Sequence, residues 1–170
     1  MGRDQDIPGA TRYDATNGRR CTAGTKKILY DENFDSRVIL LSFNWNVLAF
    51  LKKMAPQIPT AYISVTAEWF DNIKIGQPGP SPWMAGIDVD DYQESIPHSI
   101  NAAGGKIWCA WSESLTRKEV QIALELGIKV FVWIVDSERG IRKFLKMDVD
   151  GIITNRPDRA KRILSSKFKI

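Results

Sequence analysis

Short runs of consecutive apolar residues alternate along this chain with segments in which apolar residues recur every three or four positions. The runs cover residues 38–41, 60–64, 106–110, 129–135 and 151–154. Runs of this kind are typical of strands that are buried on both faces of a parallel sheet. Because a polar loop and a helical segment follow most of them, the pattern predicts repeated strand–helix units and an α/β protein.

Polar residues at the start of the helical segments support this prediction. Thr116 and Glu119 have the spacing of a capping box. The expected caps of other helices are Asn44, then Asp136 or Ser137, and finally Asn155. The helical periodicity predicts three inward-facing sets, which are Val120, Ala123 and Leu124, then Ile141, Phe144 and Leu145, and finally Ala160, Ile163 and Leu164.

The chain divides into three parts by composition. Residues 1–25 lack an apolar period and are interpreted as an irregular leader, residues 26–165 as the folded domain, and residues 166–170 as a basic tail. Within the domain, glycine and proline residues make 65–99 mostly loop, with a short strand expected at 84–89.

Motifs for nucleotide binding are absent from the sequence. Neither GxGxxG nor GxxxxGK[ST] occurs, which favours a barrel over a doubly wound sheet. A closed barrel needs eight strands, and the pattern provides four or five. We therefore expect a partial TIM-type (β/α) barrel.

Composition and charge narrow the class of protein. With 44% apolar and 26% charged residues, the 170-residue chain is ordinary for a globular domain. No apolar stretch is long enough to predict a transmembrane segment. The net charge of +4 is weak evidence for a nucleic-acid partner, and none is expected. Because Cys21 and Cys109 do not form a CxxC pair, we expect both to be reduced thiols in the cytoplasm. Cys109 lies in an apolar run and is expected in the core.

Three segments resemble the glycerophosphodiester phosphodiesterase family. Residues 41–45 read Leu-Ser-Phe-Asn-Trp, residues 130–136 read Val-Phe-Val-Trp-Ile-Val-Asp, and residues 150–158 read Asp-Gly-Ile-Ile-Thr-Asn-Arg-Pro-Asp. They are similar to a Ser-Phe-Asp strand end, a Val-x-Val-Trp-Thr-Val-Asn strand and the closing strand of that family. The resemblance spans about residues 37–165 and implies the C-terminal half of the family's barrel.

The resemblance also implies a reaction. Members of the family hydrolyse glycerophosphodiesters to glycerol phosphate and an alcohol, with a divalent metal, Mg²⁺ or Ca²⁺, held by carboxylates and with two histidines for proton transfer. The family carries these groups in its first half, in motifs such as His-Arg-Gly and Glu-x-Asp that this sequence lacks. The sole histidine, His98, matches neither family position and is expected to be a surface or helix-start residue. We therefore assign no catalytic residue, metal ligand or cofactor to this chain.

Four residues are candidates for substrate binding. Trp133, Ser42, Phe43 and Trp111 lie at or just past strand ends, on the face where barrel enzymes build their sites. The resemblance makes Trp133 a wall of the substrate pocket. Each candidate could instead serve only in packing. Asn155 and Arg156 follow the last strand, where barrels often bind phosphate, but a helix cap and an exposed charge also account for them.

The resemblance thus implies a member of the glycerophosphodiester phosphodiesterase family, whose reaction is phosphoric diester hydrolysis in glycerophospholipid metabolism. We expect this chain to be a truncated form that lacks the metal-binding and acid–base residues. One alternative is an active enzyme whose leader or partner chain supplies the missing ligands. Another is a non-catalytic half-barrel that binds a protein partner or a lipid headgroup. Either a homo-oligomer or a missing N-terminal half could complete the barrel.

Overall fold

The computed structural model describes residues 24, 27–29, 31, 32 and 34–167. The chain forms two compact units, Met1–Val38 and Ile39–Ile170. The described part of the first unit includes a 3-10 helix, η1 (Asp35–Arg37). Apart from Gly24, the predicted leader lies outside the described residues, as do residues 168–170 of the predicted tail. The predicted domain boundaries therefore stay predictions.

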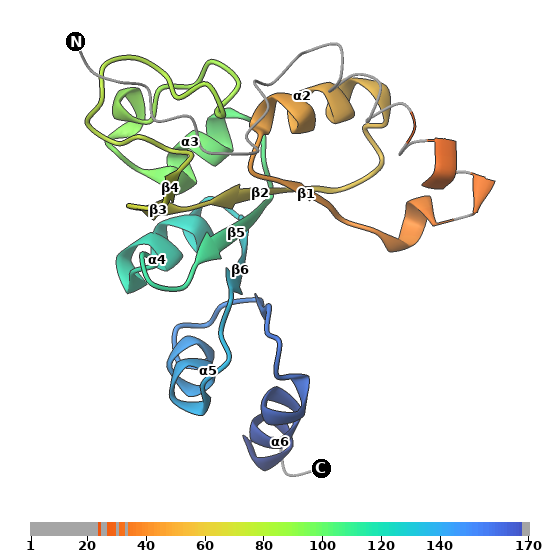
Figure 1. Ribbon diagram of the computed structural model, residues 1–170, viewed down its shortest axis with the longest axis vertical. Helices are drawn as coiled ribbons and strands as arrows, with labels where there is room; N and C mark the ends of the chain where they lie inside the picture. The colour runs from red at the N-terminus through yellow and green to blue at the C-terminus, as the bar shows by residue number, and fades with distance from the viewer. Residues whose placement is uncertain (1–23, 25–26, 30, 33, 168–170) are drawn as a thin grey trace. The chain divides into compact units, whose positions relative to one another are not determined.

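A parallel sheet organises the second unit (Figure 1). In the described residues the strands follow the order β1-β2-β5-β6-β7, and every neighbouring pair is parallel. The strands are β1 (Leu40–Ser42), β2 (Thr60–Ser64), β5 (Ile107–Trp111), β6 (Lys129–Trp133) and β7 (Gly151–Ile152). The helices are α2 (Trp45–Met54), α3 (Ile96–Ala102), α4 (Arg117–Glu125), α5 (Glu138–Leu145) and α6 (Pro157–Lys167). This confirms the α/β prediction, and the sheet is open rather than closed into a barrel.

Both faces of the sheet carry apolar side chains. On one face Tyr62, Trp108 and Val130 belong to a large core that includes helix residues such as Leu48 and Phe144. On the other face lies a smaller cluster, which contains Ala61, Ile63, Ile107 and Cys109, with Phe43, Phe131 and Trp133 packed against it. Strands with apolar residues on both faces produce the continuous apolar runs seen in the sequence.

Cys109 is a core residue, as expected. It is 3% exposed, its thiol is free, and burial raises the pKa of that thiol to about 11. A thiol with so high a pKa is protonated at neutral pH and a poor nucleophile. Cys21 lies outside the described residues.

The predicted helix starts are partly confirmed. The hydroxyl of Thr116 accepts a hydrogen bond from the backbone N–H of Glu119 (3.2 Å), and the Glu119 carboxylate accepts one from Thr116 N (3.0 Å), which completes the capping box. Ser137, one of the two candidates, caps α5 by accepting from Gly140 N at 3.1 Å. Asn155 does not cap α6, because that helix begins at Pro157 and the Asn155 amide donates elsewhere.

Two of the residues expected to face inward are substantially exposed. Leu124 in α4 is 40% exposed and Leu164 in α6 is 39% exposed. The prediction that both face the core is therefore wrong. Val120, Ala123 and Ile163 are buried as expected, so each helix buries a narrower stripe than its periodicity suggested.

The segment 65–99 contains more structure than expected. A small hairpin of β3 (Thr66–Ala67) and β4 (Phe70–Asp71) follows β2, and a 3-10 helix, η2 (Asp90–Tyr92), precedes α3. The predicted loop also runs past the start of α3, where Pro97 lies in the first turn. Proline is well tolerated at that position, and the Ser95 hydroxyl caps this helix.

The strand predicted at residues 84–89 is wrong. Met84 N donates to Ser81 O at 3.0 Å and Ile87 N to Met84 O at 3.1 Å, so this stretch is a succession of turns. Ala85 and Gly86 have positive φ angles of 57° and 82°, which a strand does not accommodate. The apolar residues are there because the turns direct side chains such as Met84, 0% exposed, into the core.

Candidate functional site

Aromatic side chains gather at the carboxyl ends of the parallel strands. Phe43, just after β1, and Trp133, the last residue of β6, have ring centroids 5.6 Å apart at an interplanar angle of 85°. Phe43 also contacts Phe70 of the hairpin at 5.5 Å, and Trp111 at the end of β5 lies 6.0 Å from Trp69. The structure thus brings Phe43 and Trp133 together directly and places Trp111 beside the same hairpin. We call Phe43, Trp111 and Trp133 the aromatic wall.

Trp133 is held in place by the neighbouring strand. Its indole N–H donates to the backbone oxygen of Cys109 at 3.1 Å, and its side chain is half-buried. In the sheet register Trp133 pairs with Trp111. Because the indole N–H is already engaged, Trp133 offers a bound molecule mainly its apolar ring surface.

Ser42 is involved in the turn between β1 and α2. Its hydroxyl oxygen accepts a hydrogen bond from Asn44 N at 3.0 Å, and the Asn44 side chain in turn accepts from Asn46 N at 3.0 Å. Asn44 therefore caps α2 as predicted. The hydroxyl of Ser42 keeps its proton available for another acceptor, since it serves here as an acceptor.

Asn72 was missed by sequence reasoning. Its side chain is 0% exposed, and its oxygen accepts from Val65 N at 2.9 Å. Its amide donates to the backbone oxygens of Phe43 and Ile63, both at 3.0 Å. One buried amide thus joins the hairpin to the ends of β1 and β2 and positions Phe43. No local sequence motif indicates this role of Asn72, because the residue lies in the loop-rich segment 65–99.

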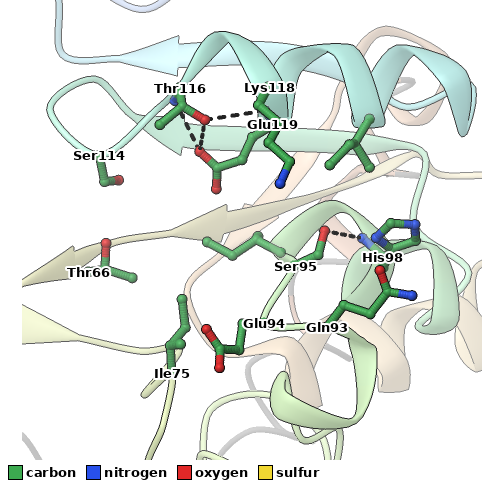
Figure 2. A pocket seen from close by; sticks show the side chains of 12 residues that line it. Thr66, Ile75, Gln93, Glu94, Ser95, His98, Ser114, Thr116, Lys118 and Glu119 are labelled. Carbon is green, nitrogen blue, oxygen red and sulfur yellow. Dashed lines mark hydrogen bonds between the residues drawn. The ribbon is translucent and has the colours of Figure 1, made fainter.

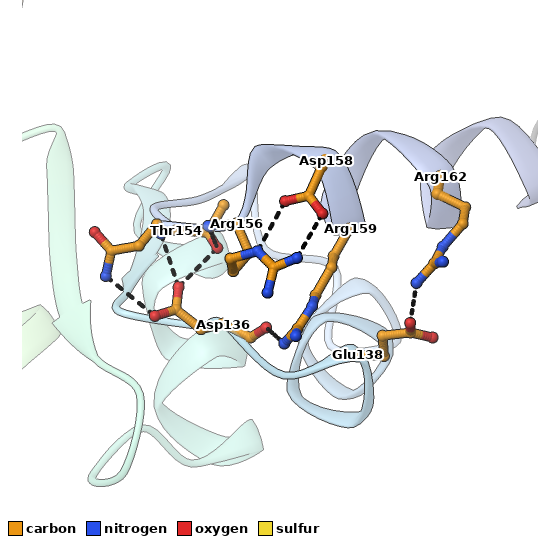
Figure 3. A network of polar contacts seen from close by, with 8 residues as sticks. Asp136, Glu138, Thr154, Arg156, Asp158, Arg159 and Arg162 are labelled. Carbon is orange, nitrogen blue, oxygen red and sulfur yellow. Dashed lines mark hydrogen bonds and ion pairs between the residues drawn. The ribbon is translucent and has the colours of Figure 1, made fainter.

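Asp136 connects the end of β6 with the end of β7 (Figure 3). Its carboxylate accepts hydrogen bonds from Thr154 Oγ1 at 2.9 Å, from Asn155 N at 2.7 Å and from Asn155 Nδ2 at 3.0 Å. These bonds, above all the one from the Asn155 side chain, lower the pKa of Asp136. Arg159 donates to the Asp136 backbone oxygen at 2.9 Å, which ties α6 to the same point.

Arg156 is engaged by a neighbouring carboxylate. Its guanidinium donates to both oxygens of Asp158, at 2.9 and 2.7 Å. The hydrogen bond from Arg156 lowers the pKa of Asp158 to about 2, and the same bond raises the pKa of Arg156. A second ion pair, between Arg162 and Glu138, joins α6 to α5. Both pairs are largely exposed, so their contribution to stability is small.

A cavity lies between the hairpin and the starts of α3 and α4 (Figure 2). It has a volume of about 410 Å³, and Thr66 of the hairpin, Ser95 and His98 at the start of α3, and Thr116 and Lys118 at the start of α4 contribute to its lining. None of the predicted site residues lines it. His98 is a helix-start residue, as expected, and its Nδ1 is buried without a hydrogen-bond partner among the described residues.

No group of three histidine, cysteine, aspartate or glutamate side chains in residues 34–167 and the few described before them could hold a metal ion. The carboxylate of Asp136 is already surrounded by three hydrogen-bond donors. In the same described part, no helix combines the length and apolar character needed to span a bilayer.

Replacing Asp136 with asparagine is expected to flatten the acid side of the stability profile. The pKa of Asp136 is lower in the folded chain than its unfolded value of about 3.9, so its contribution is complete above that pH and is lost as the pH falls. Melting temperatures between about pH 6 and about pH 3 should therefore decline less in Asp136→Asn than in the wild type. Asparagine keeps an acceptor for Thr154 and Asn155 N, so the fold should persist.

The matched control for this change is Glu113→Gln, which neutralises an exposed carboxylate in the same unit. The control removes one negative charge and leaves the hydrogen bonds to Asp136 intact, so a flatter profile in Asp136→Asn alone assigns the effect to those bonds. Equal slopes in all three proteins would show that the hydrogen bonds to Asp136 do not favour its ionised form.

A parallel α/β sheet with its candidate site at the carboxyl ends of the strands is the arrangement of (β/α) barrel enzymes. The model of the glycerophosphoryl diester phosphodiesterase family matches residues 7–159. The chain belongs to this family.

Individual relatives agree with this membership. A glycerophosphodiester phosphodiesterase from Caldanaerobacter subterraneus subsp. tengcongensis is 29% identical over 136 residues, which cover 78% of this chain and 44% of the relative. A Silicibacter pomeroyi structure assigned to the glycerophosphoryl diester phosphodiesterases is 28% identical with a TM-score of 0.76, and the match covers 96% of this chain and 48% of that one.

A Parabacteroides distasonis glycerophosphodiester phosphodiesterase shares the fold at 17% identity, with a TM-score of 0.68 over 92% of this chain and 55% of that one. The chain therefore spans about half the length of the relatives it matches.

Proposed function

We propose that this chain binds the glycerophosphoryl part of a glycerophosphodiester against the aromatic wall and takes part in phosphoric diester hydrolysis in glycerophospholipid metabolism. The contact between Phe43 and Trp133 supports this proposal most strongly, because it joins the ends of β1 and β6 at the place where barrel enzymes bind substrate. Family membership supports this substrate class.

The geometry suits a small ligand that presents C–H groups to the aromatic rings and carries an anionic end. The rings of Phe43 and Trp133 offer apolar surface for the C–H groups of glycerol. Ser42, at the end of β1, can donate its hydroxyl proton to a phosphate oxygen. The hydrogen bonds that surround the Asp136 carboxylate disperse its charge, which reduces its repulsion of an approaching phosphodiester.

Hydrolysis requires groups beyond this wall. A divalent metal would neutralise phosphate charge when bound, but the described carboxylates do not form a set that fits one. His98, the sole histidine of the sequence, lines a cavity that none of the wall residues shares. We therefore propose that the chain alone binds glycerol phosphate without turning over diesters, and that metal and acid–base groups come from another segment or chain.

The first test is titration with sn-glycerol 3-phosphate, followed by intrinsic fluorescence. Saturable binding should change the emission of the wild type, and Trp133→Phe should lose most of that change because the responding indole is gone. Trp108→Phe is the matched control, since Trp108 projects from the opposite face of the sheet into the large core and is 1% exposed. The same response in the wild type and Trp133→Phe, or a response in neither, would remove Trp133 from the site.

The second arm measures turnover of glycerophosphocholine with Mg²⁺ or Ca²⁺ present. We expect no hydrolysis by the chain alone. Hydrolysis that EDTA abolishes would contradict that part of the proposal and would show that this chain assembles a complete metal site.

A further inference from the structure

The hairpin after β2 places a tryptophan in contact with water. Trp69 lies at the turn between β3 and β4 and is 61% exposed, although an indole in water forgoes a large burial free energy. Phe70 stacks on it with centroids 6.2 Å apart and an interplanar angle of 29°. Trp111, half-buried at the end of β5, stands at 90° to it with centroids 6.0 Å apart. Packing alone does not account for leaving this ring exposed.

The hairpin holds Trp69 in a fixed position. Phe70 contacts Trp83 at 5.4 Å and Phe43 at 5.5 Å, both nearly perpendicular to it. The buried amide of Asn72 anchors the strand that follows the turn. Trp69 is therefore preorganised beside Trp111, and Phe70 connects it with Phe43 of the aromatic wall.

We propose that Trp69 and Trp111 form a binding site for a quaternary ammonium group, so that the chain favours choline-bearing phosphodiesters. The inference rests on the proposed function for the glycerophosphoryl part of the ligand. An ammonium group that lies against the exposed ring of Trp69 would come within the ~6 Å range of cation–π attraction. The perpendicular ring of Trp111, with its centroid 6.0 Å from that of Trp69, would border the same position. Methylated ammonium groups suit such sites because they lose little hydration and contact the rings through their methyl groups.

The local charge favours a cation. The segments 66–71 and 107–114, which carry the two tryptophans, contain Glu68, Asp71 and Glu113 but neither lysine nor arginine. Glu68 and Glu113 are exposed. An anionic group would meet repulsion here, whereas the ammonium end of a choline ester would be attracted.

The test uses the full chain labelled with ¹⁵N, in which each of the six tryptophans contributes an indole N–H resonance. Trp69→Tyr and Trp111→Phe assign two of these resonances by their loss. Choline chloride and 3,3-dimethyl-1-butanol, an uncharged compound of the same shape, are titrated separately. Choline should shift the Trp69 and Trp111 resonances, and at equal concentration the neutral compound should shift them much less.

Substitutions then separate charge recognition from apolar contact. Trp69→Leu should weaken choline binding about 2- to 5-fold and reduce the preference over the neutral compound, whereas Trp69→Tyr should retain most of both. Equal binding of choline and 3,3-dimethyl-1-butanol, or unchanged Trp69 and Trp111 resonances, overturns the proposal. Because Trp69 is exposed, these variants should keep the wild-type melting temperature.

Two further arms identify the source of the choline group. Binding to soluble glycerophosphocholine is compared with sedimentation on phosphatidylcholine vesicles, with glycerophosphoglycerol and phosphatidylglycerol vesicles as the matched ligands without choline. Stronger binding of the choline-bearing ligand in either comparison supports the site and identifies the source of the choline group. Equal binding with and without choline in both comparisons overturns the proposal. Failure of the proposed function is distinguishable, because glycerol 3-phosphate would then leave Trp133 unaffected while choline still shifts Trp69.

Discussion

Replacing Asn72 with leucine is expected to lower the free energy of unfolding by about 2–4 kcal/mol, since buried polar groups left without partners are costly. The substitution removes a side chain that is 0% exposed and makes three hydrogen bonds, to Val65, Phe43 and Ile63. Leucine has a similar volume but cannot pair with the Val65 N–H or the two carbonyl oxygens. Urea denaturation followed by circular dichroism measures the loss.

Two further variants test whether the lost hydrogen bonds of Asn72 cause the destabilisation. Asn101→Leu makes the same chemical change at an exposed position of α3. A surface change of this kind should alter the free energy of unfolding by less than about 0.5 kcal/mol. Asn72→Asp keeps the size but directs a carboxylate at two carbonyl oxygens, so it should destabilise at least as strongly at neutral pH. A loss below about 1 kcal/mol for Asn72→Leu would mean that water replaces the amide.

Trp45→Ala is expected to cost about 3–5 kcal/mol, the range for removing a large aromatic side chain from a core. Trp45 is 0% exposed at the start of α2, and its ring stands at 88° to that of Tyr62 with centroids 5.0 Å apart. Its indole N–H donates to Ile63 O at 3.3 Å. Since domains are stable by only about 5–15 kcal/mol, the variant should melt far below the wild type.

The matched control deletes the same side chain from the surface. Trp69→Ala removes an indole that is 61% exposed. Its loss should lower the free energy of unfolding by less than about 1 kcal/mol. Similar melting temperatures for the two variants would indicate that the helix side of the sheet repacks around the missing Trp45 ring.

Much of the sheet was predictable because its strands carry apolar residues on both faces. Such runs leave a signal that is local in sequence, as do the capping box of Thr116 and the cap of Asn44. The hairpin was not predictable, since each of its strands has two residues and cannot show an alternation. Whether another copy or segment pairs with β1 and β7 stays a prediction.

The candidate site was predictable residue by residue but not as an arrangement. The ends of parallel strands meet at one edge of a sheet, which is why Phe43, Trp111 and Trp133 were expected together. Phe43 contacts Trp133 directly, whereas Trp69 and Phe70 of the hairpin connect Trp111 with Phe43. Asp136 was expected as a possible helix cap, yet its hydrogen bonds reach Asn155 after the next strand. Contacts of this range follow from tertiary packing and leave no local pattern.

The strand order has a consequence for how the chain folds. The connection from Trp111 to Lys129 is one short helix, whereas the connection from Ser64 to Ile107 includes the hairpin, η2 and α3. Closing a longer loop costs more conformational entropy, about 0.6 kcal/mol for each doubling of length. Pairing of β5 with β6 is therefore the more local step, and proteins gain folding speed from local contacts. The long connection therefore delays the pairing of β2 with β5. This pairing forms the junction at which Trp69 of the hairpin meets Trp111.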